Sequence, residues 1–294
     1  MTNPPDEIIA AAKAGNRAAL TALVGQIQPD LFALCVRMLW HRQDAEDACQ
    51  EILIKLVTRL STFRGDSRFS TWLYRVAVRH LIDFRRGRVE GTVATFEAFS
   101  DDLLAGPHEP TRELRERPDY NLLLHEVKTG CSLAMLLCLD REHRAAYIVG
   151  EILEFDHREA ASTLGVSAAT FRKRLSRARA RVLEFTRRSC GLVNAGAPCL
   201  CPRRLAPAIA LGRITPRAPH HATADTSSIP YSEIERTIGE LDEGRRAVAL
   251  FRSQAIPESA RSFAGTLDEI LKRADRRAAR HSRVSKNKPP AHRT

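Results

Sequence analysis

Aromatic residues make up only 6% of this 294-residue sequence, and long apolar runs are missing. The apolar residues are mainly Ala, Leu, Ile and Val, which suits helices better than sheets. No apolar run approaches the roughly 20 residues of a membrane-spanning helix, so we expect no membrane insertion. The N-terminus lacks a basic segment followed by an apolar stretch, so no export signal is recognisable there. We therefore expect a cytoplasmic protein.

Enzyme signatures and a disulfide framework are also missing. The sequence has no P-loop, Gly-rich dinucleotide turn, nucleophile elbow or HExxH motif, so we expect no enzymatic activity. Its seven cysteines are an odd number, which argues against a complete set of disulfides. In a cytoplasmic protein we expect them to be reduced.

The charge balance is strongly basic, with a formal net charge of +11. Such an excess attracts polyanions, either nucleic acid or an anionic membrane surface. Helical patterns recur in two segments, and a stretch rich in Glu, Asp and Pro separates them. We predict an all-α protein with two helical domains, a flexible acidic linker and a Cys-containing extension that is partly helical with a basic tail. The predicted bounds are 1–88 and 121–189 for the domains, 89–120 for the linker and 190–294 for the extension.

Helical spacing gives more detail within these segments. One helix is predicted to begin at Asp6 and to carry Leu23 on its inner face. The most regular helix covers 44–60. In the extension, 190–230 has an irregular pattern, and helices are predicted over 231–253 and 258–281.

The predicted helix over 44–60 begins with an acidic cluster that stands out in so basic a protein. Two explanations remain open. Acidic residues interact favourably with a helix N-terminus, and they also suit docking to a basic protein surface. The polar face of this helix includes Asp44, Asp47, Gln50 and Glu51.

A tight loop and a basic helix follow. The loop is Phe63-Arg64-Gly65-Asp66-Ser67, with glycine at its turn. The helix after it carries Arg75 and Arg79 on its polar face. A basic helix beside exposed aromatic rings suits single-stranded nucleic acid, because bases stack on rings and phosphates pair with arginine. The alternative places the aromatic rings in the core, and we favour it for Trp72.

Residues 156–182 predict a helix-turn-helix. Asp156 and Glu159 have capping-box spacing, Gly165 ends the first helix and Ser167 caps the second. Arginine can bind guanine through two hydrogen bonds or bind phosphate. The alternative is a solvated basic face on an ordinary helix. We favour DNA binding because the caps, the glycine turn and the basic face all have the spacing of a helix-turn-helix. The predicted contact residues are Thr170, Arg172, Lys173, Arg174, Ser176 and Arg177.

The segment DAEDACQEILIKLV followed by FRGDSRFSTWLYRVAVRHLIDFRR resembles the second conserved region of the sigma-70 family, in its extracytoplasmic-function (ECF) group. Residues 156–182 resemble the fourth region of the same family. The resemblance implies a sigma factor that binds core RNA polymerase and directs promoter recognition and transcription initiation. It also implies an anti-sigma factor as a further candidate partner.

The resemblance assigns roles to the motifs. The acidic helix would bind the clamp helices of the largest polymerase subunit. The loop 63–67 would receive a base flipped from the −10 element, and Arg75 and Arg79 would line the melted strand. The basic helix would read the −35 element as duplex DNA. Many members have Asn where this chain has Arg79, which leaves the preferred −10 base open.

Two further alternatives concern function and metal. A helix-turn-helix repressor or activator would bind duplex DNA without polymerase, but it leaves the acidic helix and the FRGDSRFSTWLYR segment unexplained. Cys190, Cys199 and Cys201 lie close together in the sequence, with His220 and His221 further along. Three thiolates and one imidazole would suit zinc, and Cys-x-Cys near a third cysteine would suit a redox sensor. We favour no bound cofactor, with zinc as an alternative.

Overall fold

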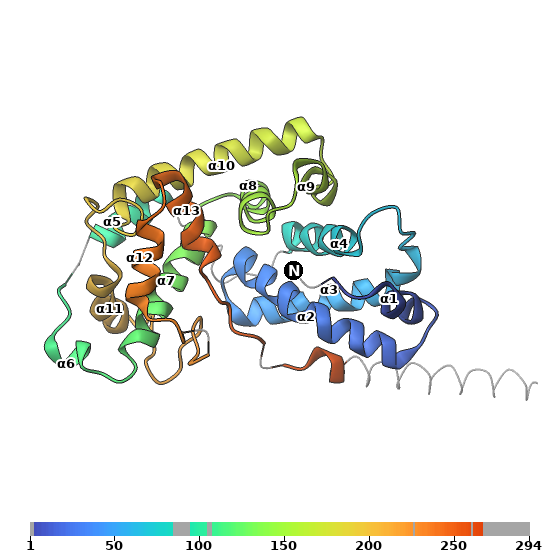
Figure 1. Cartoon of the computed structure of the whole chain (residues 1–294), viewed down its shortest axis with the longest axis horizontal. Coiled ribbons are helices and arrows are strands. Elements are labelled where there is room, and N and C mark those ends of the chain that lie inside the picture. The colour runs from blue at the N-terminus through green and yellow to red at the C-terminus, as the bar shows by residue number, and fades with distance from the viewer. Residues whose placement is uncertain (1–2, 85–94, 105–107, 226, 260, 267–294) are drawn as a thin grey trace, which may run out of the picture.

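The computed structural model describes residues 3–84, 95–104, 108–225, 227–259 and 261–266. Within these ranges the protein is helical, and its β-structure is limited to one isolated bridge between Cys190 and Cys199 (Figure 1). The predicted all-α class is therefore confirmed. One continuous hydrophobic core runs through the helices of both predicted domains and into the extension.

The first helical module surrounds a long central helix. Its elements are α1 (Asp6–Lys13), α2 (Arg17–Leu39), α3 (Arg42–Arg59), the 3-10 turn η1 (Leu60–Thr62) and α4 (Phe69–Asp83). The single helix predicted from Asp6 is broken, because the backbone at Gly15 has a φ of 90° and a new helix starts after it. The Asn16 side chain caps α2 by accepting a hydrogen bond from the backbone N–H of Ala19 at 3.1 Å.

Among the described helices, α2 alone is long and apolar enough to span a membrane by length and composition. Our expectation from the sequence had excluded any such segment. Much of α2 is buried, including Leu23, Val24 and Cys35, and it packs against α1, α3, α4 and α7. These contacts are those of a core helix in a helical bundle.

The second module and the linker are packed together. The linker carries α5 (Phe96–Leu104) and α6 (Arg112–Arg115), and the module itself comprises α7 (Tyr120–Leu137), α8 (Arg141–Tyr147), the π-helix η2 (Ile148–Ile152), α9 (His157–Leu164) and α10 (Ala168–Ser189). The ring of Phe185 on α10 lies 5.1 Å from that of Phe96 and 5.3 Å from that of Phe99. Aromatic contacts thus hold α5 against α10.

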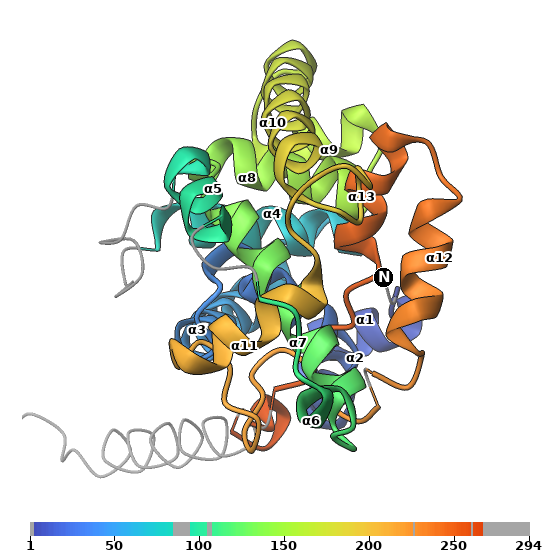
Figure 2. The same ribbon diagram turned by 90° about the vertical axis from the view of Figure 1, so that its left-hand side faces the viewer.

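The extension adds α11 (Cys201–Ala210), α12 (Tyr231–Gly239) and α13 (Glu243–Arg252). Both α11 and α12 pack on α7, and Figure 2 shows α11 beside it. The helix predicted over 231–253 is divided, because the Asp242 side chain accepts from the N–H of Arg245 and starts α13 as a separate helix. The predicted helix 258–281 lies mostly outside the described residues, as does the basic tail.

A buried arginine joins the two modules. Arg144 on α8 is 4% exposed and donates to the carbonyls of Leu136 and Leu139, both at 2.9 Å, and of Leu137 at 3.3 Å. It also donates to the carbonyl of Met38 in the last turn of α2. The last carbonyls of a helix lack partners within that helix, and a cation is favourable there. One side chain therefore satisfies the ends of both α7 and α2.

Replacing Arg144 by Met keeps the side-chain length but removes the charged donor to these buried carbonyls, of which that of Leu136 still accepts from the backbone N–H of Leu139 at 3.2 Å. We expect Arg144→Met to lower the free energy of unfolding by about 2–4 kcal/mol, because buried groups that lose a charged partner keep their desolvation cost. Urea unfolding measures this. Arg112→Met is the control, since the Arg112 side chain is 85% exposed and should change stability by less than about 0.5 kcal/mol. Equal unfolding midpoints for the two variants would contradict the role of Arg144.

Candidate nucleic-acid interface and neighbouring surfaces

The turn between α9 and α10 has the caps that the sequence predicts. The Asp156 carboxylate accepts from the backbone N–H groups of Arg158 at 2.8 Å and of Glu159 at 3.0 Å. Gly165 ends α9 with a φ of 67°, a left-handed conformation that favours glycine. The Ser167 hydroxyl then accepts from the N–H of Thr170 at 3.1 Å and starts α10. The predicted helix-turn-helix is confirmed in its caps and its turn.

The inner face of α10 fixes the direction of its outer face. Phe171, Leu175, Ala178 and Val182 are buried against the core. Helical spacing therefore directs the intervening residues outward. The exposed predicted contact residues are Thr170, Arg172, Lys173, Ser176 and Arg177.

Arg174 is the exception among the predicted contact residues of α10. Its side chain is 22% exposed and forms an ion pair with Glu142 on α8. The structure thus turns Arg174 back toward the protein and balances its charge. Glu142 lies 32 residues away in the sequence, so local spacing could not reveal this pair.

An aromatic cluster supports the loop between η1 and α4. The Phe63 ring lies 5.4 Å from that of Phe69 and 5.6 Å from that of Trp72. Phe69 is buried and Trp72 is packed half-buried against the core, as favoured from the sequence. Arg64, Gly65, Asp66 and Ser67 are exposed, and Gly65 has a φ of 83°. The rings hold the base of the loop while its tip faces solvent.

The polar face of α4 contacts the second module (Figure 1). Arg75 donates through Nε to the carbonyl of Ser162 on α9 at 2.9 Å, and through Nη2 to the Ser162 hydroxyl. Arg79 is exposed, but its guanidinium lies beside Gly165 of the second module. A Cβ atom added at Gly165 would be 3.1 Å from Nη2 of Arg79. The sequence predicted an open basic face here. The structure instead places Arg75 at the contact between the modules.

The acidic face of α3 is half-buried and engaged with neighbouring side chains. Asp44 lies 3.7 Å from Nδ1 of His41, and Glu51 lies 3.5 Å from Nε2 of His80. Asp47 pairs at 3.2 Å with Arg261 from the extension. The structure places Gln50 half-buried on the same helix. The sequence predicted this face but not its partner Arg261.

Glu46, one turn from Gln50, is 8% exposed. Its carboxylate lies 3.5 Å from Nε of Arg42 and 3.1 Å from Nε of Arg261. A buried carboxylate is stable only with such partners. Arg261 therefore joins two acidic side chains of α3, and its distance along the chain concealed this from sequence analysis.

The predicted cysteine cluster gains a fourth member. Cys190 ends α10, Cys199 pairs with it through the backbone bridge, and Cys201 begins α11. Cys131 on α7 lies close enough for its thiol to interact electrostatically with the other three. All seven cysteines fall within the described residues, and none forms a disulfide.

Burial determines the chemistry of these thiols. It raises the pKa of Cys199 to about 12 and also raises the pKa values of Cys131, Cys190 and Cys201. Desolvation outweighs the positive charge of Arg204, which acts in the opposite direction on Cys131 and Cys199. Among the described residues, no group of three or more His, Cys, Asp or Glu side chains is arranged to hold a metal ion. The absence of a cofactor stays a prediction from the sequence, with zinc as its alternative.

The two candidate histidines serve another contact. The backbone N–H groups of His220 and His221 donate to the Glu126 carboxylate on α7 at 2.8 and 2.7 Å. The His221 ring lies against Gly130, where a Cβ atom would be 3.4 Å from it. Burial lowers the pKa of His221 to about 4, so its ring is neutral at physiological pH. These contacts anchor the loop between α11 and α12 on α7.

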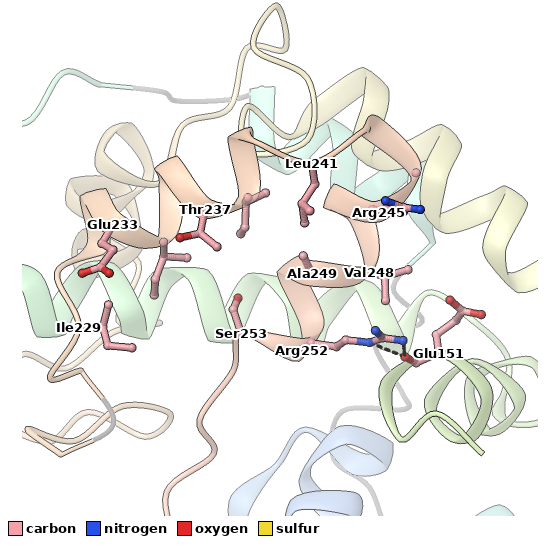
Figure 3. A pocket seen from close by; sticks show the side chains of 13 residues that line it. Glu151, Ile229, Glu233, Thr237, Leu241, Arg245, Val248, Ala249, Arg252 and Ser253 are labelled. Atoms are coloured by element: carbon pink, nitrogen blue, oxygen red, sulfur yellow. Dashed lines mark hydrogen bonds between the residues drawn. The ribbon is translucent and has the colours of Figure 1, made fainter. Parts of the chain in front are cut away.

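A groove of about 690 Å³ lies between α12 and α13 (Figure 3). Leu241, Val248 and Ala249 contribute apolar lining, and Arg252 donates to the carbonyl of Glu151 at its edge. The groove contains no residue that the sequence predicted for DNA or polymerase contacts. It is a separate feature of the extension.

The fold and these surfaces define a helical DNA-binding protein, and comparisons with known proteins give its family. Residues 23–90 match Sigma-70 region 2, and residues 130–182 match Sigma-70, region 4. The ECF RNA polymerase sigma-E factor of Escherichia coli is 30% identical over 171 residues, which cover 56% of this chain and 85% of that protein. The RNA polymerase sigma-H factor of Pseudomonas aeruginosa is 28% identical over 177 residues, or 59% and 89% of the two chains.

A solved structure of CnrH in complex with the cytosolic domain of CnrY is also similar, with 22% identity, a TM-score of 0.42, and coverage of 59% of this chain and 91% of that one. The sequence matches decide the assignment. The chain belongs to the ECF group of the sigma-70 family of RNA polymerase sigma factors. Proteins of this family are transcription initiation factors and not enzymes.

The buried cysteines should react slowly in the folded protein. A thiol attacks as the thiolate, and the raised pKa values of the four cluster thiols keep that form scarce at pH 8. We expect little reaction of the native protein with a disulfide reagent at pH 8, a rate that rises as the pH approaches 10, and rapid reaction of all seven cysteines after unfolding. Absorbance of the released thiol measures this. Rapid modification of several cysteines in the native protein at pH 8 would show that the cluster is accessible and reactive.

Proposed function

We propose that this sigma factor acts in the cytoplasm, binds core RNA polymerase through α3, and directs it to promoters through the loop 63–67, α4 and α10. The observation that carries the proposal is the exposed basic face of α10, which a capped helix-turn-helix presents. The second recognition surface comes from the region 2 match in the same chain. A repressor would need only the helix-turn-helix. The presence of both recognition surfaces in one chain therefore favours a sigma factor over a repressor.

In this proposal the acidic residues of α3 contact the polymerase. The residues are Asp44, Asp47, Gln50 and Glu51. All four are partly exposed, while the apolar residues Ala45, Ala48 and Cys49 of the same helix are buried. The core thus fixes the orientation of the acidic face. A basic partner surface would gain orientation and association rate from this charge.

The proposed −10 contacts are the exposed loop residues Arg64 to Ser67 together with Phe63, Arg75 and Arg79. The loop is accessible as the structure stands. Arg75 is not, because Ser162 holds it. Binding of the melted strand along α4 therefore requires the two modules to separate. The contacts that must break are the Arg75–Ser162 hydrogen bonds and the apolar packing of α4 on the second module, where the Tyr74 ring lies 5.4 Å from that of Phe155.

For the −35 element, Arg177 on the exposed face of α10 is the sharpest test. If its side chain reads a base, Arg177→Ala should weaken promoter binding by about 1–3 kcal/mol and relax one position of the site. If it binds phosphate, all sequences should weaken alike and the salt dependence should fall by about one unit. Binding to a promoter library at several salt concentrations separates these results.

The control for this test is Arg188→Ala, at the C-terminal end of α10, where the side chain is 79% exposed and lies 3.9 Å from Glu184. It removes the same charge outside the proposed contact set and should leave sequence preference unchanged. If Arg177→Ala and the control give the same binding profile, α10 is not the recognition helix.

For polymerase binding, we expect Glu51→Lys to weaken the complex with bacterial core polymerase by about tenfold, because it reverses a charge on the docking face. Run-off transcription should fall in parallel. Glu116→Lys makes the same charge change directly after α6, where the Glu116 side chain is 61% exposed, and should have no such effect. Circular dichroism shows whether helicity is kept. Equal polymerase affinity for the native protein and Glu51→Lys would remove α3 from the interface.

A further inference from the structure

The extension reaches back over the first module in a segment that we call the strap, residues 254–259 and 261–266. It leaves α13 and runs along α2 and α3 (Figure 1). The start is fixed by the buried Lys128 of α7, whose Nζ donates to the Ser253 carbonyl at 2.9 Å and hydroxyl at 3.0 Å. Phe263 fixes the other end and is 3% exposed.

The strap is paired with α2 and α3 through both backbone and side chains. Gln28 of α2 donates to the carbonyl of Arg261 at 3.0 Å and accepts from the N–H of Phe263 at 3.3 Å. Arg42 of α3 donates to the carbonyl of Glu258 at 2.6 Å. These bonds align the strap, which ends in a helical turn at 263–266, along the two helices. They make the strap a specific contact and not a loose covering.

The charge of the strap complements the surface beneath it. Arg261 lies 3.1 Å from the Glu46 carboxylate and 3.2 Å from that of Asp47. Ser259 adds a hydrogen bond to Glu46 at 3.4 Å. Asp47 is one of the proposed polymerase contacts. A basic side chain of the protein itself therefore occupies the position that a basic partner would take.

We propose that the strap competes in cis with core RNA polymerase for the acidic face of α3, so that polymerase binds tightly only when the strap is displaced. This inference rests on the proposed function of α3. A strapped form that cannot bind lowers the apparent affinity by the fraction of molecules in the open form.

The contacts suit displacement. The Arg261 side chain is 48% exposed, and ion pairs at such positions are weak. Glu46 keeps Arg42 as a partner at 3.5 Å when the strap leaves, so no buried carboxylate is stranded. The apolar contact of Phe263 is the main cost of opening. A partner that covers the same patch would compensate for it.

The test uses full-length chains and core polymerase. Arg261→Glu places a third negative charge beside Glu46 and Asp47 and should open the strap, which raises polymerase affinity by about three- to tenfold. Phe263→Ser removes the apolar anchor and should act in the same direction. Arg245→Glu on α13 is the control, since Arg245 pairs with Asp242 and its side chain is 78% exposed. It should leave affinity unchanged.

Hydrogen exchange of residues 256–259 and 261–266 gives an independent reading. The strap should be protected in the free native protein and should lose that protection both in Arg261→Glu and in the native complex with polymerase. Unchanged affinity in both strap variants, together with equal protection in the free and bound protein, would overturn the inference.

The Glu51→Lys variant separates the two ideas, because Glu51 pairs with His80 and not with the strap. If Glu51→Lys weakens binding while the strap variants match the native protein, α3 is the docking face and the strap does not compete. If Glu51→Lys has no effect on binding, the docking face is misplaced, and the strap inference fails with it.

Discussion

The guanidinium of Arg144 is the interaction on which the arrangement of this protein depends. It lies where α2 ends and where the chain turns from α7 into α8, and it donates hydrogen bonds to backbone carbonyls from both modules. Carbonyls at helix ends that are buried need donors, and apolar packing cannot supply them. The hydrophobic core continues around this point from one module into the other. The two modules are thus held in one body, in which the polar face of α4 contacts the second module, the acidic face of α3 contacts the extension, and the basic face of α10 stays exposed.

This closed arrangement explains why several proposed functional residues have partners inside the protein. Arg75 is bonded to Ser162, Arg174 to Glu142 and Asp47 to Arg261. Each of these three charges is matched by a group from a distant part of the chain. The pairs involve half-exposed side chains, so each contributes only modestly to stability. A sigma factor must exchange such contacts for DNA and polymerase, and weak internal partners make that exchange feasible. The strap would extend the same principle to the polymerase-binding face.

Features that depend on a few neighbouring residues could be read from the sequence. The caps at Asp156 and Ser167 and the left-handed Gly165 were predicted correctly, because a cap acts over three residues and a glycine turn over one. The prediction from the sequence was wrong where it placed one helix across a point at which the chain ends one helix and starts another. Asn16 and Asp242 each cap a new helix within a segment predicted as one helix. The helix α11 was missed in a segment rich in Cys, Gly and Pro, although Pro202 in its first turn is a typical start signal.

The sequence by itself determined the helical class, the two recognition modules and the buried faces of their helices, because periodicity and capping are local properties of the chain. It also predicted which side chains face outward on α10. Only the tertiary structure decided which of those side chains are free. Arg174 and Arg177 are alike in sequence, but Glu142 pairs with the first. The thiols of the cysteine cluster have raised pKa values because helices from three segments bury them together. Desolvation and ion pairing depend on what the folded chain brings within a few ångströms, and sequence spacing does not contain that information.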